Sequence, residues 1–364
     1  MTAEELQLFR DSLSGALREV SGVENFRKQV NGDNAYPSKV WQTLFELGCC
    51  ALLVEEAKGG LGLGAREALI LSEEIGKSLS LSAIVPSALI SAYAISKFTS
   101  GDVQGDVLPN LLSGEYRVSY GPGDLRELKS GKLISNENAG VFSLSGSIQS
   151  SVSFAESHAV LALATNGDTY ETLLVLIDKE TNGLSSHVFV GIDGRSYSKL
   201  SFQNVEVSAA RVFRSDCQFQ KFIAFGALIY GGEQIGAAQA AFNLTLDYLK
   251  QREQFGKRIG SYQALQHRAA IMKVELAKAS ALLRKAAREL DQAGPDAEKL
   301  CFMAKAKASQ VSGLVVNEAV QMHGGIGMTE EYDVGLYLKR VAVSEKLFGG
   351  VDYHTKRTAE LHGI

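Results

Sequence analysis

The spacing of hydrophobic residues divides the chain into three regions. Over 1–113 apolar positions recur every three or four residues, which is typical of helices that pack one face on a core. One such helix is expected over 65–77, with Ala68 and Ile75 on its buried face and Glu73 on the opposite, polar face. The first region is therefore predicted to be an N-terminal helical domain.

Residues 114–214 change to short runs rich in β-branched and aromatic residues, separated by Gly, Asn, Asp and Ser. No helical pattern alternates with these runs, which argues against a Rossmann unit. The pattern predicts a central β-domain, either an antiparallel sheet or a small barrel. Its strands are expected at 116–120, 141–144, 159–164, 172–177, 187–190, 199–202 and 211–213.

Residues 215–364 return to helical spacing, in stretches long enough to lie side by side as a four-helix bundle. The predicted fold class is mainly α with a central β-domain, the domains being 1–113, 114–214 and 215–364. The four long helices are expected at 222–254, 262–293, 296–322 and 331–346.

Composition excludes several functions. The net charge is −4 and no long basic run occurs, so a nucleic acid partner is not expected. The most apolar stretch, 78–97, carries several serines and Pro86, which indicates a buried helical segment and no membrane span. The acidic, polar residues 1–10 do not resemble a signal peptide, and we expect a cytoplasmic protein.

The cysteines show no pattern of a metal site or a disulfide framework. We expect reduced, small apolar core residues, so no metal is predicted. The four are Cys49, Cys50, Cys217 and Cys301.

A first cluster of polar and glycine residues, 251–263, joins two predicted long helices. The guanidinium of Arg252 can make charge-assisted, bidentate hydrogen bonds to a diphosphate. Phe255 offers a flat face to a heteroaromatic ring, and the neighbouring glycines allow a ligand to approach the backbone. The alternative is a basic, solvated turn between helices.

A second cluster, 321–329, places three glycines in four residues between two predicted helices. Such a turn can present backbone amides and a helix N-terminus to phosphate or carbonyl groups. The alternative is an ordinary glycine cap between helices. Three glycines exceed what capping requires, so a ligand contact is favoured.

Together the two clusters resemble the acyl-CoA dehydrogenase family. The family run Arg-Glu-Gln-Phe-Gly-Lys-x-Ile-Gly-x-x-Gln corresponds to Arg252–Gln263. The family turn Gln-x-x-Gly-Gly-x-Gly-x-Thr corresponds to Gln321–Thr329, and the Arg that follows it to Arg340. The resemblance extends over nearly the whole chain and is weakest in its middle.

The resemblance implies that FAD lies between the β-domain and the bundle and reaches a neighbouring subunit. It further implies an acyl-CoA substrate and electron transfer to an electron-transfer flavoprotein. Arg252, Phe255 and Gln263 correspond to residues that hold FAD across a dimer, while Gln321 and Gly325 correspond to residues on its nucleotide half. Ser119 corresponds to a threonine that contacts the flavin.

The chain departs from the family at the catalytic base. In the family, a glutamate removes the α-proton of the thioester while a hydride leaves to the flavin. The position of that glutamate near the C-terminus corresponds to Gly349 here. Other members carry it on the long helix before the Arg-Glu-Gln-Phe-Gly run, and that position corresponds to Gly226.

Glu233 is a candidate for a relocated base or active-site carboxylate, because it lies about two helical turns after Gly226 on the same helix face. It follows Gly231 and Gly232, each of which costs about 1 kcal/mol relative to Ala within a helix. That cost suggests a helix thinned for a ligand or for another helix. The alternative is a buried glutamate paired with a bundle cation such as Arg268.

Three functions remain open from the sequence. The chain is an acyl-CoA dehydrogenase with an unusual base, active as a homo-oligomer. Or it is one subunit of a hetero-oligomer, as known in bacterial steroid degradation, that completes the FAD site of a base-bearing paralogue. Or it is a flavin-free scaffold of the same fold. The missing carboxylates beside an intact Arg252–Gln263 run favour the hetero-oligomer.

Overall fold

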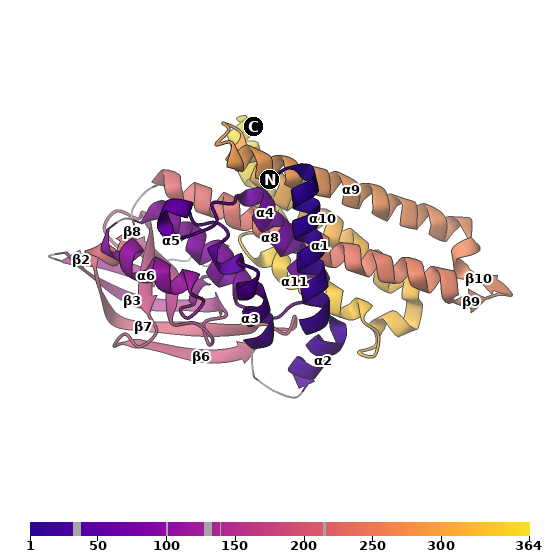
Figure 1. The fold of residues 1–364 in the computed structure, drawn as a ribbon, viewed down its shortest axis with the longest axis horizontal. Coiled ribbons are helices and arrows are strands. Elements are labelled where there is room, and N and C mark those ends of the chain that lie inside the picture. The colour runs from indigo at the N-terminus through magenta and orange to yellow at the C-terminus, as the bar shows by residue number, and fades with distance from the viewer. Residues whose placement is uncertain (32–37, 100, 127–132, 139, 214–215) are drawn as a thin grey trace.

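The computed structural model describes residues 1–31, 38–99, 101–126, 133–138, 140–213 and 216–364. Helices form the first part of the chain, strands the middle part, and long helices the last part (Figure 1). The sheet lies at one end of the elongated molecule, and the long helices extend from it to the other end (Figure 1). The change from helix to strand falls between Leu112 and Val118.

The N-terminal helices begin with a capping box, in which the Thr2 hydroxyl accepts a hydrogen bond from the Glu5 amide. The predicted helix over 65–77 is confirmed as α4, but Glu73 does not lie on an exposed face. It is buried and accepts a hydrogen bond from Arg10 of α1, because α1 covers that side of α4. The helices are α1 Ala3–Val20, α2 Val23–Asn31, α3 Ser38–Glu46, α4 Ala65–Lys77, the π-helix η3 Ile84–Ser91, α5 Ala92–Phe98 and α6 Asp102–Leu112.

The central strands form one sheet in the order β6-β7-β3-β1-β4-β5-β8, with β2 paired to β3 and β4. The expectation of an antiparallel sheet holds only in part, because β1 and β2 both run parallel to β4. β2 was also missed. The strands are β1 Val118–Gly121, β2 Leu133–Asn138, β3 Val141–Val152, β4 Ala159–Asn166, β5 Thr172–Asp178, β6 Leu184–Val190, β7 Ser196–Ser208 and β8 Val212–Phe213.

The C-terminal part is built around α8, which packs against α4, α9, α10 and α11. The predicted helix ending at Gln254 stops earlier, at Gln251, and a two-stranded hairpin of β9 and β10 follows. A fifth helix, α12, was not predicted. The elements are α8 Asp216–Gln251, β9 Glu253–Gln254, β10 Lys257–Arg258, α9 Gln263–Asp291, α10 Ala297–His323, α11 Val334–Lys346 and α12 Val351–His362.

Glycines of α8 mark close contacts with neighbouring helices. A Cβ on Gly236 would lie 1.9 Å from the carbonyl oxygen of Glu73, and one on Gly232 would lie 2.3 Å from the Ser72 hydroxyl. A Cβ on Gly231 would lie 2.9 Å from the side chain of Leu283 on α9. The glycines of α8 therefore allow α4 and α9 to pack closely against it. This is the second of the two explanations given for Gly231 and Gly232, namely contact with another helix.

The segment expected to be buried and helical, 78–97, holds the π-helix and most of α5. No helix in the described part of the chain is long and apolar enough to span a membrane. Cys49, Cys50 and Cys301 are free and buried, and burial raises the pKa of the Cys49 and Cys50 thiols to about 12. The side chain of Cys217 lies outside the described residues.

Candidate functional site

The first sequence cluster folds into a hairpin that projects from the end of the bundle (Figure 1). Its two-residue turn consists of Phe255 and Gly256, whose φ angles are +54° and +76°. Two left-handed residues in succession form the turn that suits a short hairpin. The side chain of Phe255 is 92% exposed at the tip, and Arg252 at the base is also exposed. Both are free to contact a ligand or a second subunit.

The second cluster forms a short 3-10 turn, Gly324–Met328, between α10 and α11. Gly324 has a φ angle of +66°, and a Cβ on Gly325 would meet no atom within 4 Å. Gln321 and Gly325 are exposed. The open space above Gly325 means that a ligand can approach this backbone directly.

Tyr248 of α8 connects the two clusters. Its hydroxyl donates a hydrogen bond to the carbonyl oxygen of His323 at 3.4 Å, and the two rings lie 4.4 Å apart. Four residues later comes Arg252, whose amide donates to the Tyr248 carbonyl. The predicted nucleotide-binding residues therefore gather at one end of the bundle, together with Gln263 at the start of α9. All five of these residues are exposed.

The two positions assigned to the catalytic base meet inside the molecule. A Cβ on Gly226 would lie 2.1 Å from Cδ1 and 2.2 Å from Cε1 of the Phe348 ring, and Phe348 directly precedes Gly349. The Phe348 ring thus packs directly against the backbone of α8 and occupies the space that a side chain at position 226 would need. Phe348 is 1% exposed.

Aromatic residues from the sheet and α8 complete this cluster. The Phe348 ring lies 5.0 Å from Tyr120 of β1, 5.2 Å from Phe222 and 5.9 Å from Tyr230. Tyr120 donates a hydrogen bond of 2.7 Å to the Tyr230 hydroxyl. Burial raises the pKa of both phenols well above the ordinary value, so neither is a base at neutral pH. We call these four residues the aromatic plug.

The backbone at Gly349 requires glycine. Its φ angle is +95°, and a Cβ there would lie 2.7 Å from the Tyr353 ring and 2.8 Å from Nε2 of His354. The same Nε2 lies 2.8 Å from the carbonyl oxygen of Phe348, and burial lowers the pKa of His354 to about 3. A neutral imidazole therefore fixes the turn, which leaves no room for a glutamate side chain in this conformation.

Ser119 does not face the bundle. Its buried hydroxyl donates to the carbonyl oxygen of Ala159 at 3.2 Å and lies 3.3 Å from the hydroxyl of Ser151, both within the sheet. Side chains alternate along a strand, so its neighbour Tyr120 points toward α8 instead. The geometry argues against the predicted flavin contact of Ser119 and identifies Tyr120, which the sequence analysis missed, as the residue of β1 at that interface.

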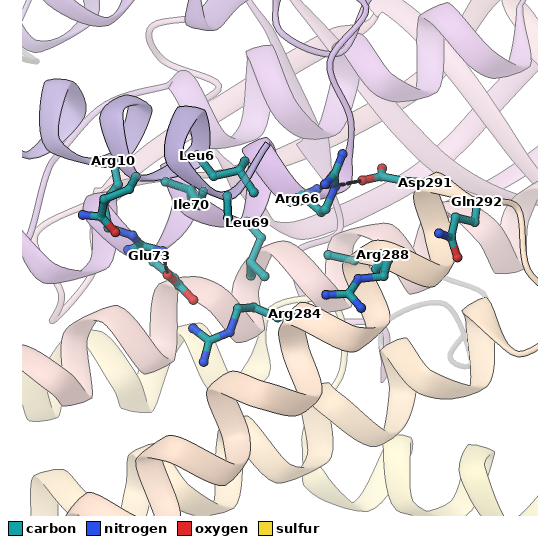
Figure 2. A pocket seen from close by; sticks show the side chains of 13 residues that line it. Leu6, Arg10, Arg66, Leu69, Ile70, Glu73, Arg284, Arg288, Asp291 and Gln292 are labelled. Carbon is teal, nitrogen blue, oxygen red and sulfur yellow. Dashed lines mark hydrogen bonds and ion pairs between the residues drawn. The ribbon is translucent and has the colours of Figure 1, made fainter. Parts of the chain in front are cut away.

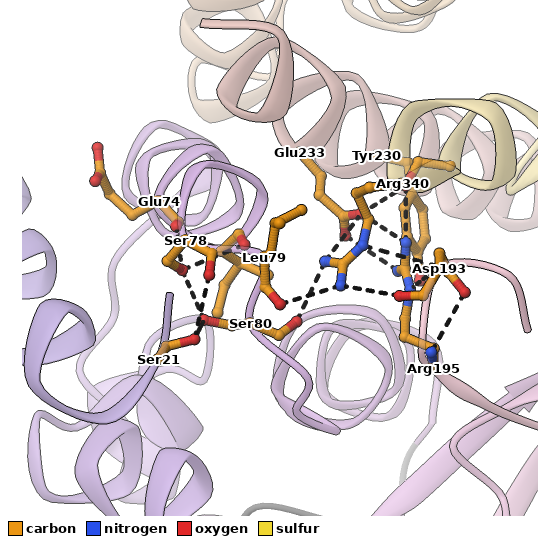
Figure 3. A network of polar contacts seen from close by, with 12 residues as sticks. Ser21, Glu74, Ser78, Leu79, Ser80, Asp193, Arg195, Tyr230, Glu233 and Arg340 are labelled. Carbon is orange, nitrogen blue, oxygen red and sulfur yellow. Dashed lines mark hydrogen bonds and ion pairs between the residues drawn. The ribbon is translucent and has the colours of Figure 1, made fainter. Parts of the chain in front are cut away.

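Glu233 is fully buried, and both of its oxygens are engaged (Figure 3). Arg195 donates to Oε1 at 2.7 Å and to Oε2 at 3.2 Å, and the Ser344 hydroxyl donates to Oε1 at 2.5 Å. The predicted partner Arg268 lies elsewhere and pairs with Glu318 at 2.6 Å. The geometry favours a structural glutamate over a base, although its cation is Arg195.

The ion network around Glu233 joins all three parts of the chain (Figure 3). Arg195 also pairs with Asp193 at 2.5 Å, and both lie between β6 and β7. Arg340 of α11 donates to the carbonyl oxygens of Leu79 and Ser80 at 3.2 Å and of Asp193 at 3.4 Å. Arg340 thus serves this network and does not reach the glycine turn with which the sequence analysis grouped it.

Lys305 adds a further cation beside the network. It is fully buried, and its Nζ donates to the carbonyl oxygen of Ser344 at 2.8 Å. Burial lowers the pKa of Lys305 to about 7, since a charged ammonium loses its hydration there. Among the described residues no group of three or more His, Cys, Asp or Glu could hold a metal ion.

Known proteins resemble the chain over almost its entire length. The N-terminal domain model of acyl-CoA dehydrogenases matches residues 3–115, and the C-terminal domain model matches residues 218–360. Acyl-CoA dehydrogenase IpdE2 of Mycolicibacterium smegmatis is 28% identical over 351 residues, which cover 95% of either chain. The mitochondrial short/branched chain specific acyl-CoA dehydrogenase of Bos taurus is 28% identical, over 87% of this chain and 76% of the bovine one.

Solved structures share the fold. The ChsE4-ChsE5 complex from Mycobacterium tuberculosis superposes with a TM-score of 0.91 at 21% identity, over 100% of this chain and 98% of the other. The Tcur3481-Tcur3483 steroid ACAD superposes with a TM-score of 0.89 at 24% identity, over 99% and 98%. These matches confirm the predicted order of helical, β and helical parts. The chain therefore belongs to the acyl-CoA dehydrogenase family of oxidoreductases.

Proposed function

We propose that this chain is the companion subunit of a hetero-oligomeric acyl-CoA dehydrogenase, in which a base-bearing paralogue dehydrogenates the thioester. One observation carries the proposal: the Phe348 ring fills the space in front of Gly226, and the Gly349 backbone accepts no side chain. Both positions that the family uses for its base are thus closed to a carboxylate side chain.

The bundle end of this chain suits the nucleotide half of FAD, but the interface between β1 and α8 does not suit the flavin. Arg252, Phe255 and Gln263, with Gln321 and Gly325, are exposed at the bundle end and would hold the nucleotide half of an FAD shared with the paralogue. The aromatic plug occupies the interface between β1 and α8, where the flavin and thioester would have to meet. Bound FAD would supply the hydride acceptor, and electrons would pass to an electron-transfer flavoprotein.

Two further points support a hetero-oligomer. Two solved structures that share the fold carry the names of two different chains, and one of them is called a steroid ACAD. Glu233 is held by Arg195 and Ser344, which leaves it no free oxygen to accept a proton from a substrate.

We infer a bulky acyl-CoA, of the steroid class, as the substrate of the assembled complex.

The test is to purify the chain alone and together with a base-bearing paralogue encoded beside it, and to record flavin absorbance and acyl-CoA dehydrogenation. We expect a colourless single chain and a yellow, active complex. A yellow, active homo-oligomer would refute the proposal. A complex that forms but binds no flavin would identify a scaffold instead.

Replacement of Arg252 separates nucleotide binding from assembly. We expect Arg252→Ala in the complex to weaken FAD binding by at least about tenfold, because one charge-assisted contact contributes about 1.5–3 kcal/mol. Lys250→Ala is the matched control, since Lys250 is also exposed, on the last turn of α8, but pairs with Asp247. Equal flavin content in both variants would contradict the assignment of Arg252.

A further inference from the structure

A groove outside the aromatic plug and the nucleotide end lies between α1, α4 and α9. Its volume is about 570 Å³, within the range of about 300–1,000 Å³ that is common for small-molecule sites. Figure 2 shows Arg284 and Arg288 side by side on α9, across from Leu69 and Glu73 of α4. Neither arginine belongs to the aromatic plug or to the nucleotide end described above.

Two of the four arginines that line the groove already have partners. Arg10 donates to Glu74 at 2.8 Å and to Glu73 at 2.5 Å. Arg66 pairs with Asp291 at 3.0 Å, and the same carboxylate accepts the amide of Ala65 at the start of α4. One arginine thus faces two carboxylates at the Arg10 end of the groove, while Arg66 and Asp291 pair one to one at the other end.

Arg284 and Arg288 remain. Within the described part of the chain, neither guanidinium takes part in an ion pair or a hydrogen bond. The two lie four residues apart on one helix, and such neighbours have Cβ atoms about 5–6 Å apart. Both guanidiniums can therefore reach one anionic group, and each has the planar donors that suit a carboxylate or a phosphate.

The walls beside these arginines are apolar. Leu6 of α1, Leu69 and Ile70 of α4, and Ala287 of α9 line the groove. A small inorganic anion would leave these walls in contact with water, whereas a hydrocarbon body would cover them at about 25 cal/mol per Å² of apolar surface. The groove thus offers a charged end and an apolar body in one cavity.

We propose that the groove between α1, α4 and α9 binds an amphipathic anion, a carboxylate or phosphate head on a hydrocarbon body, through Arg284 and Arg288. The head lies between the two guanidiniums and the body along Leu6, Leu69 and Ile70. This site is separate from the FAD and thioester sites, and it does not depend on whether the chain is a companion subunit.

Calorimetric titration of the assembled protein with dodecanoate, dodecyl phosphate and inorganic phosphate tests the site. We expect one saturable site for at least one of the dodecyl compounds, and the better of the two identifies the head group. Arg284→Gln combined with Arg288→Gln should weaken that binding by at least about tenfold. Lys285→Gln is the matched control, since Lys285 is exposed on the same helix but does not line the groove.

Three results would overturn the proposal. One is the absence of saturable binding by either dodecyl compound. Another is binding that the double variant and the Lys285 control weaken equally. The last is binding of inorganic phosphate as tight as that of dodecyl phosphate, which would reveal an anion site without use of the apolar walls. The thermal midpoints of all variants, measured alongside, show that each is folded.

Discussion

The contact between Phe348 and Gly226 can be tested by a double-mutant cycle. Alanine at position 226 would place its Cβ 2.1 Å from the Phe348 ring, far inside the 3.5–4.0 Å at which carbon atoms attract each other. The perturbation therefore pairs Gly226→Ala with Phe348→Ala, which removes the ring.

The expected magnitudes follow from two opposing effects. In a helix interior, Ala in place of Gly stabilises by about 1 kcal/mol, whereas overpacking costs about 1–3 kcal/mol. Gly226→Ala alone should thus lower the free energy of unfolding by up to about 2 kcal/mol. Phe348→Ala alone should lower it by about 3–5 kcal/mol. With the ring removed, Gly226→Ala should instead stabilise by about 1 kcal/mol, so the two changes should couple by about 1–3 kcal/mol.

Urea unfolding of the four proteins, followed by far-ultraviolet circular dichroism, measures the cycle. Gly313→Ala on α10 is the control, because a Cβ there meets no atom within 4 Å. It should stabilise by about 1 kcal/mol with or without the Phe348 ring. If the changes at 226 and 348 are additive within about 0.5 kcal/mol, the ring does not rest on α8 and the main support for a companion subunit is lost.

Three further predictions concern the residues around the plug. Glu233→Gln should lower the free energy of unfolding by about 3–5 kcal/mol, since it leaves the buried Arg195 and Arg340 with Asp193 in place of two carboxylates, while dehydrogenation by the assembled complex stays unchanged; a selective loss of rate would restore Glu233 as a base. Lys305 has a folded pKa of about 7 and an ordinary value of 10.5, so between these values the unfolded chain binds the extra proton. Stability should therefore rise with pH by about 1.4 kcal/mol per unit above pH 7 and decline as pH falls toward 7, and chemical unfolding at several pH values should show a flatter profile in Lys305→Met. Gly349→Ala should lower the thermal midpoint, because alanine is strained at a φ angle of +95° and its Cβ would contact the Tyr353 ring too closely. An unchanged midpoint would contradict the turn geometry.

Local patterns predicted the helices and most strands well, because each depends on neighbours in the sequence. The helix over 65–77 follows from its own periodicity. β2 was missed because 133–138 is polar and gains its place from pairing with β3 and β4. The parallel pairing of β1 with β4 is likewise a long-range choice that no local pattern records.

The candidate site shows the same division. The hairpin with Phe255 and the turn with Gly325 lie within single stretches of sequence, and their motifs located them. The plug could not be found this way, because Tyr120, Phe222, Tyr230 and Phe348 come from three distant segments. The burial of Glu233 against Arg195 depends on a contact between α8 and the loop that joins β6 to β7. The predicted partner, Arg268 of α9, instead pairs with Glu318.

The Arg195, Glu233 and Arg340 network has a consequence for how the chain comes apart. A fragment holding only the helices from Asp216 onward would keep Glu233 and Arg340 but lose Arg195 and Asp193. In a fragment with the first helices alone, the carbonyl groups of Leu79 and Ser80 would lack the Arg340 guanidinium that donates to them. Each piece would then lose hydrogen-bond or charge partners that only the others supply. The three parts should accordingly melt in a single transition, and none should fold as an independent unit.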